Sequence, residues 1–291
     1  MQRSAARRVC AEPSGWERWV RRFRFPVLFV PLFAALLAVA EVASRLAPVP
    51  LLALPAGVGL AVAGLACYRW LARVVEGRDT VLEVAPRHRW AGLARGAALG
   101  AWLFCSVLAL IGMLDGWGRV TWGSFSGVLG VAGVLAAVAT MEEIVFRGVL
   151  FRMLEERAGT AVSVVVSSSL FGLAHLLNTG ATPWTALSVG LTGGGVLAAA
   201  YVVTRSLWLP IGLHFGWNFA QAGVFGVELS GADVEPSGLL LLELDGPVVL
   251  TGGPFGPEAS VPAVLVCLVA TGVLLRQAAR TARIRPRPRS S

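Results

Sequence analysis

The sequence predicts an all-α fold, a polytopic membrane bundle of about eight transmembrane helices. Composition is the first reason: 56% of the 291 residues are hydrophobic, 14% are charged, and the mean hydropathy is +0.70. Soluble globular domains carry about 25% charged residues, so several segments of this chain must be solvated by lipid. The other two reasons are the spacing of the long apolar segments and the positions of the arginines.

The apolar segments account for the helix count. A spanning helix needs roughly 20 mainly apolar residues, and eight such segments can be placed if occasional polar residues are tolerated. In chain order they are 27–46, 51–70, 94–114, 125–146, 161–177, 184–204, 208–225 and 259–275. A further apolar stretch, 238–244, is too short to span and is expected at the membrane interface.

The arginines predict the orientation. All 25 basic residues are arginine and the formal net charge is +8, which by itself is compatible with nucleic-acid binding. The arginines lie beside the apolar segments, however. With a cytoplasmic amino terminus, all except Arg45 and Arg119 fall in the tails or on inner helix ends. The positive-inside rule therefore predicts a multi-pass cell-membrane protein with both termini cytoplasmic and no nucleic-acid partner.

The chain divides into three predicted parts. Residues 1–24 form a basic cytoplasmic tail, 25–275 a transmembrane domain, and 276–291 a second basic cytoplasmic tail. Both tails are expected at the anionic inner surface of the membrane. A cleaved signal peptide is the alternative for the first apolar segment, but its long basic lead and its length favour an uncleaved anchor.

The fourth apolar segment carries charges that are costly in a membrane. Glu142, Glu143 and Arg147 lie toward its inner end, in Met-Glu-Glu-Ile-Val-Phe-Arg-Gly. A carboxylate at a helix centre costs about 2.5–3.5 kcal/mol on insertion scales, so it persists when paired, near water or functional. Glu143 and Arg147 are four apart, which favours an ion pair and leaves Glu142 unpaired. The alternative is that all three are solvated in the inner interface.

Two histidines and an asparagine are the other polar candidates in the apolar core. His175 lies near the end of the fifth segment, and His214 and Asn218 share one helix face in the seventh, four residues apart. A lone intramembrane histidine often only bridges helices, through a hydrogen bond worth about 1 kcal/mol. Because both histidines occur together with the acids, a shared site is favoured.

These side chains have the chemistry that amide hydrolysis requires: a base for water, donors for an oxyanion and a proton source. Glu142 could take a proton from water that His175 helps to hold, while His214 and Asn218 stabilise the oxyanion. A zinc site is the competing interpretation. The spacing does not decide between them, because His-Glu-x-x-His is absent. The cysteines occur singly and predict neither a disulfide framework nor a zinc site; they are Cys10, Cys67, Cys105 and Cys267.

Three ordered motifs resemble one known family. Glu142-Glu143-x-x-x-Arg147, Phe171-x-x-x-His175 and His214-x-x-x-Asn218 are similar to those of the CPBP family, also called the Abi or CAAX-protease type. The resemblance covers residues 127–225, about a third of the chain. It implies an eight-helix bundle around an intramembrane catalytic cavity, and a glutamate-dependent endopeptidase without a metal cofactor.

The resemblance also implies roles. Glu142 resembles the water-activating base assisted by His175, His214 and Asn218 resemble the oxyanion pair, and Glu143 and Arg147 resemble supporting residues. The implied partners are the lipid bilayer and a protein or peptide substrate, lipid-modified or membrane-embedded. Eukaryotic members cleave prenylated Cys-a-a-X proteins, whereas bacterial members resemble immunity and surface-protein-processing factors. The Ala-, Gly- and Arg-rich composition without lysine favours a bacterial source.

Three other interpretations stay open at this point: a non-catalytic immunity or scaffold protein of the same fold, a zinc-dependent protease, and a proton relay or transporter. If the chain is a protease, the inward direction of the fourth segment predicts cleavage near the cytoplasmic side.

Overall fold

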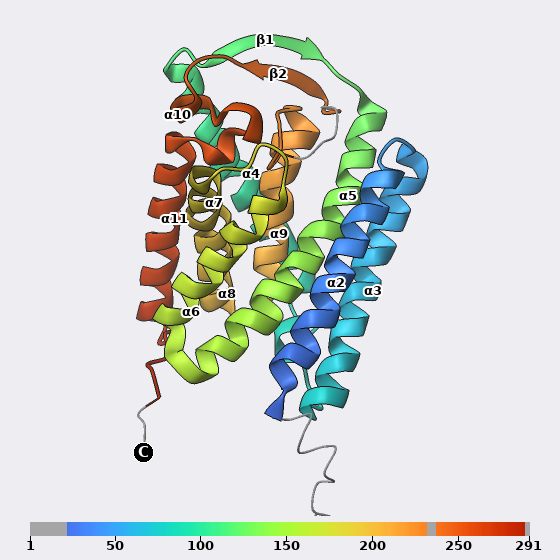
Figure 1. Cartoon of the computed structure of the whole chain (residues 1–291), viewed down its shortest axis with the longest axis vertical. Coiled ribbons are helices and arrows are strands. Elements are labelled where there is room, and N and C mark those ends of the chain that lie inside the picture. The colour runs from blue at the N-terminus through green and yellow to red at the C-terminus, as the bar shows by residue number, and fades with distance from the viewer. Residues whose placement is uncertain (1–21, 232–236, 289–291) are drawn as a thin grey trace, which may run out of the picture.

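The computed structural model describes residues 22–231 and 237–288, which form a bundle of helices running mainly along one axis (Figure 1). Three long helices come first: α2 (Arg24–Leu46), α3 (Pro50–Glu76) and α4 (Arg89–Met113). Each lies on a predicted apolar segment and is long enough to cross a hydrocarbon core of about 30 Å. A short 3-10 helix, η1 (Leu82–Val84), lies in the link between α3 and α4.

The fourth and fifth predicted segments belong to one helical stretch with a sharp turn. α5 (Phe125–Glu143) continues through the π-helix η2 (Ile144–Phe151) into α6 (Arg152–Ala174), and a 3-10 turn, η3 (His175–Leu177), ends it. The chain turns at Gly159, whose φ of 76° and ψ of 171° suit glycine. α5 and most of α6 therefore run in opposite directions (Figure 1).

The remaining helices complete the bundle. α7, η4 and α8 are continuous, as are α9 and η5, and in both cases a π-helix replaces regular α-helix within the segment. The bounds are α7 (Pro183–Val189), η4 (Gly190–Gly194), α8 (Gly195–Thr204), α9 (Trp208–Asn218), η5 (Phe219–Val224) and α11 (Val261–Arg280).

Two strands cover one end of the bundle, which we call the strand end (top of Figure 1). β1 (Trp117–Trp122) and β2 (Leu240–Leu244) are antiparallel, with Val120 opposite Leu242. The stretch expected at the membrane interface is therefore a strand, and its pairing with β1 was not predicted. Short helices follow β2: α10 (Val248–Thr251), η6 (Gly253–Phe255) and η7 (Pro257–Ala259).

Both ends of the described chain lie at the opposite end of the bundle, which we call the tail end (Figure 1). α2 starts there at Arg24 and α11 finishes there at Arg280, five residues beyond the predicted boundary. The following tail contacts the turn of α6, because Thr160 N donates to Arg285 O (3.0 Å) and Arg285 N donates to Thr160 Oγ1 (2.8 Å). The first predicted tail lies largely outside the described residues.

The described part of the chain contains six helices that are long and apolar enough to cross a membrane. The fold is thus the predicted all-α polytopic membrane bundle. All eight apolar segments are essentially helical. The count differs because one continuous helical stretch, Phe125–Leu177, holds two predicted segments, and because α9 with η5 is shorter than the other spans.

Small residues bring the site-bearing helices close to their neighbours. A Cβ on Gly96 of α4 would lie 2.3 Å from Leu209 O, and one on Gly212 of α9 would lie 2.2 Å from Leu93 O. Close backbone approach of this kind is typical of helix packing in membranes. It fixes the position of α9, which carries His214.

A buried polar network ties the helices together at the tail end. The Tyr68 hydroxyl is shared between the carboxylate of Glu83 and the carbonyl of Gly148 (2.8 Å). Arg152 donates to Gly148 O (2.9 Å) and pairs with Glu76 (2.7 Å). The network joins α3 and the η1 link to the π-helix that directly follows Glu143.

Candidate active site

Glu143 and Arg147 form a fully buried ion pair behind the site. Arg147 Nη1 lies 2.9 Å from Glu143 Oε1, and both side chains are 0% exposed, which confirms the pair predicted from their spacing. Arg147 Nη2 donates to the carbonyl of Gly194 (3.1 Å), and the guanidinium lies 4.6 Å from the ring centroid of Phe171. The pair therefore connects η2, η4 and α6.

Two π-helices meet at this arginine. Arg147 belongs to η2, and its acceptor Gly194 belongs to η4. π-helical turns shift backbone carbonyls out of the regular pattern and are frequent at functional sites. Here the shifted geometry lets a buried guanidinium reach main-chain oxygen, although Arg147 Nε has no hydrogen-bond partner among the described residues.

His214 contacts both adjacent carboxylates. Its Nδ1 lies 3.0 Å from Glu143 Oε1, and its Nε2 lies 3.6 Å from Glu142 Oε2. Glu143 also accepts from Arg147, and a hydrogen bond from the ring to a carboxylate oxygen places the ring proton on Nδ1. The Nε2 atom is thereby turned toward Glu142. Spacing along the helix assigned Glu143 only Arg147 as a partner, so this second partner was missed.

His175 is oriented differently. Its Nδ1 lies 2.8 Å from the carbonyl of Phe171, one turn earlier in the chain. A carbonyl only accepts, so Nδ1 carries a proton in this contact, and in the neutral form of the ring Nε2 has a free lone pair. The ring of Phe171 lies 4.8 Å from that of His175 and 6.0 Å from that of His214. Phe171 thus packs against both imidazoles.

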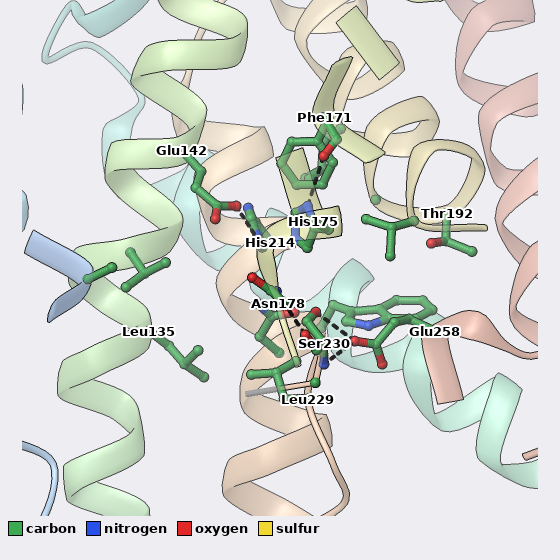
Figure 2. Close-up of a pocket in the computed structure, with 18 of the residues that line it drawn as sticks. Leu135, Glu142, Phe171, His175, Asn178, Thr192, His214, Leu229, Ser230 and Glu258 are labelled. Atoms are coloured by element: carbon green, nitrogen blue, oxygen red, sulfur yellow. Dashed lines mark hydrogen bonds and ion pairs between the residues drawn. The ribbon is translucent and has the colours of Figure 1, made fainter. Parts of the chain in front are cut away.

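A cavity of about 430 Å³ brings four of the predicted site residues together. Glu142, His175, His214 and Asn218 all line it, and Figure 2 shows the carboxylate of Glu142 directed toward His214. Glu142 remains 17% exposed, unlike its neighbour Glu143. Glu142 also lies about halfway along the helix between Phe125 and the turn at Gly159, so the cavity is deep within the bundle.

Three lining residues were not identified from the sequence. Asn178 donates to the carbonyl of Ser230 (2.8 Å), and the Ser230 hydroxyl donates to Glu258 (2.7 Å), as Figure 2 shows. Gln221 also donates to the buried Glu258. Asn178 follows His175 by three residues, which was a usable signal. Glu258 lies in a Gly- and Pro-rich loop, where nothing in the pattern marked it.

Glu258 is an unusual group for a loop, because its carboxyl is buried. Burial raises the pKa of Glu258 above its ordinary value, and the hydrogen bonds from Ser230 and Gln221 oppose that rise. These contacts hold the segment around Ser230 against α9 and its continuation. Glu258 therefore fixes one wall of the cavity.

Metal ligation was the competing interpretation of the acids and histidines. Within residues 22–231 and 237–288, no group of three or more His, Cys, Asp or Glu side chains is arranged to hold a metal ion. The expectation that the site works without a metal ion stays a prediction.

Fold and site together define a polytopic helical membrane protein with acids and histidines around a cavity within the bundle. One family model matches residues 123–220. It is described as type II CAAX prenyl endopeptidase Rce1-like. This range, about a third of the chain, contains all three motifs, and the match supports the resemblance to the CPBP, or CAAX-protease, family. Comparison with curated proteins gave no match, and comparison with solved structures gave none.

Proposed function

We propose that this protein is an intramembrane endopeptidase that hydrolyses a peptide bond with water activated by Glu142. The observation that carries the proposal is the difference between two adjacent carboxylates. Glu142 is partly exposed and lines the cavity, whereas Glu143 is buried and contacts Arg147 and His214. One carboxylate is committed to structure, and its neighbour is free to meet a substrate. The family match supports peptide hydrolysis as the reaction class.

Two acceptors are available to orient the attacking water. Glu142 and His175 both line the cavity, and Nε2 of the neutral form of His175 offers a lone pair in addition to the Glu142 carboxylate. Each can accept one hydrogen of the same water molecule, which directs the oxygen lone pair at the substrate carbonyl. As the oxygen–carbon bond forms, Glu142 takes the proton. It returns that proton to the amine when the carbon–nitrogen bond breaks, which yields a carboxylic acid and an amine.

The oxyanion requires donors, and the contacts of His214 determine how it supplies one. Since Nδ1 donates to Glu143, Nε2 can donate only if the ring is an imidazolium. The carboxylates flank the possible donors: Glu143 faces Arg147, and Glu142 faces Nε2 of His214. The amide of Asn218, one turn away, supplies the second donor.

The proposal also covers the substrate and the location of the enzyme in the membrane. The substrate is a protein or peptide, membrane-embedded or lipid-modified, and the enzyme is a multi-pass protein of the cell membrane with both termini cytoplasmic. The arginine distribution supports this orientation. No cofactor takes part in the proposed reaction, so activity should survive treatment with a metal chelator.

The test compares cells that produce the wild type with cells that produce Glu142→Gln, using Glu243→Gln, at an exposed strand residue, as the matched control. New protein termini are mapped in the membrane fraction and in released peptides. We expect termini that are present with the wild type and the control and absent with Glu142→Gln. Identical termini in all three strains would favour the non-catalytic alternative.

A further inference from the structure

The cavity extends from Glu142 toward one end of the bundle only. On α5, its other lining residues are Val138, Leu135 and Val134, all of which precede Glu142 in the chain. Since α5 begins at the strand end, each step back from Glu142 leads toward that end (Figure 1). α2 contributes Ser44, which belongs to its last turn at the same end.

Loops at the strand end form the outer part of the cavity. Asn178, Ser230 and Glu258 line it, and Figure 2 shows them grouped apart from Glu142 and His214. Leu177 and Thr179 also line it, and both are exposed, Leu177 by 78%. The accessible part of the cavity therefore lies between the end of α6 and the end of α2.

Toward the tail end the cavity is closed. Every residue of the π-helix Ile144–Phe151, which follows the two acids, is buried, including the guanidinium of Arg147. Beneath it lies the network of Tyr68, Glu83 and Arg152, whose side chains are also buried. A polypeptide could not reach Glu142 from that end without displacing packed side chains and breaking buried ion pairs.

The two ends differ in charge. In the described residues of the strand end the only arginines are Arg45 and Arg119, and acids such as Asp115, Glu243 and Asp245 lie in the same loops and strands. The tail end carries the arginine-rich helix ends and the tail after α11. By the positive-inside rule, the tail end is cytoplasmic and the strand end faces the other side.

We propose that the cavity is entered from the extracytoplasmic side of the membrane, so that its substrate is a polypeptide segment presented outside the cytoplasm. The identity of the occupant as a substrate rests on the proposed function, but the route into the cavity does not. This assignment reverses the expectation of cytoplasmic cleavage, which followed from the direction of the fourth segment alone. Both interpretations use the same direction for that segment, and they differ because the cavity extends back from Glu142.

The orientation is tested by labelling single cysteines in a variant whose four native cysteines are replaced by serine. Thr179→Cys and Thr121→Cys place a thiol at exposed positions of the strand end, and Thr80→Cys does so at the tail end. A membrane-impermeant maleimide is added to intact and to permeabilised cells. We expect the first two to be labelled at least tenfold more than Thr80→Cys in intact cells, and all three to be labelled after permeabilisation. The reverse pattern, or equal labelling of both ends, overturns the proposal.

The route is tested with Val138→Cys, which places a thiol inside the cavity one turn before Glu142. A small charged methanethiosulfonate is applied to intact cells and to inverted vesicles. We expect modification in intact cells at least tenfold faster than in inverted vesicles, and the same ratio when Glu142→Gln is also present. Faster modification in inverted vesicles overturns the route. Because the readout does not need cleavage, loss of the proposed activity would leave this result interpretable.

Discussion

The Nδ1 atom of His214 lies 3.0 Å from Glu143 Oε1, although 71 residues separate the two along the chain. The same carboxylate oxygen also accepts from Arg147 at 2.9 Å. Glu143 therefore contacts both a buried guanidinium and the imidazole, which is the geometry expected of a positioning residue in the proposed reaction. Its neighbour Glu142 meets the opposite side of that imidazole and the cavity.

Replacing Glu143 should harm both stability and activity. Glu143→Gln leaves Arg147 as a buried charge without a counter-charge, and loss of one partner of a buried pair costs about 3–5 kcal/mol. We expect a large drop in the thermal unfolding midpoint of the purified protein. Glu143→Gln combined with Arg147→Met should recover much of that stability without recovering activity, because His214 still lacks its carboxylate.

The chain provides a matched control for this experiment. Glu41 and Arg45 form a pair with the same four-residue spacing at 2.6 Å, but both side chains are more than half exposed. Glu41→Gln should change stability by less than about 1 kcal/mol. Equal midpoints for Glu143→Gln and Glu41→Gln would show that the buried pair has no special role.

Asn218→Ala should reduce kcat about 10²–10³-fold, the usual effect of removing one oxyanion donor, while KM changes little. The comparison is Asn178→Ala, because the amide of Asn178 also lines the cavity but donates to Ser230 O. Steady-state kinetics on a cleaved peptide separate the two parameters. A rise in KM with unchanged kcat in Asn218→Ala would mean that Asn218 only binds the ground state.

Glu258 should make stability depend on pH. Its pKa is raised above 4.5 by burial, so the folded protein keeps this proton at pH values where the unfolded chain has lost it. Stability contributed by this group is therefore full at low pH and is lost as the pH rises from about 4.5 through the raised pKa. Midpoints measured across this range should fall more for the wild type than for Glu258→Gln. Parallel curves would contradict the assignment.

Gly212→Ala should disturb the helix that carries His214. The added methyl would lie 2.2 Å from Leu93 O, so α4 and α9 must separate. We expect a lower unfolding midpoint and reduced activity. Gly272→Ala on α11 is the control, because its methyl has nothing within 4 Å and alanine favours helix by about 1 kcal/mol. A Gly212→Ala protein with wild-type stability would show that this contact is not tight.

Much of the fold could be predicted from the sequence because a lipid solvent imposes simple rules. Long apolar segments must be helical to satisfy their backbone, and all eight were essentially helical. The pairing of β1 with β2 could not be predicted in the same way. Trp117 and Leu244 meet through tertiary contact, and neither strand is long enough to give a clear pattern.

The candidate site, like the fold, could be predicted from the sequence only in part. The Glu143–Arg147 pair followed from helical spacing, which is local information. The contact between His214 and Glu143 and the grouping of Asn178, Ser230 and Glu258 depend on how helices and loops pack, so no local pattern specified them. The extension of the cavity from Glu142 toward the strand end could not be read from local pattern either, since it depends on which face of α5 is covered.

The most direct test of the account is the rate of peptide cleavage by purified Glu142→Gln relative to the purified wild type. The substrate is a peptide containing a cleavage site identified from the mapped termini, and folding is checked by the unfolding midpoint. Loss of a general base should lower the rate about 10²–10⁴-fold while the midpoint stays near that of the wild type. Cleavage by a folded Glu142→Gln protein at the wild-type rate would contradict the assignment of Glu142 as the base.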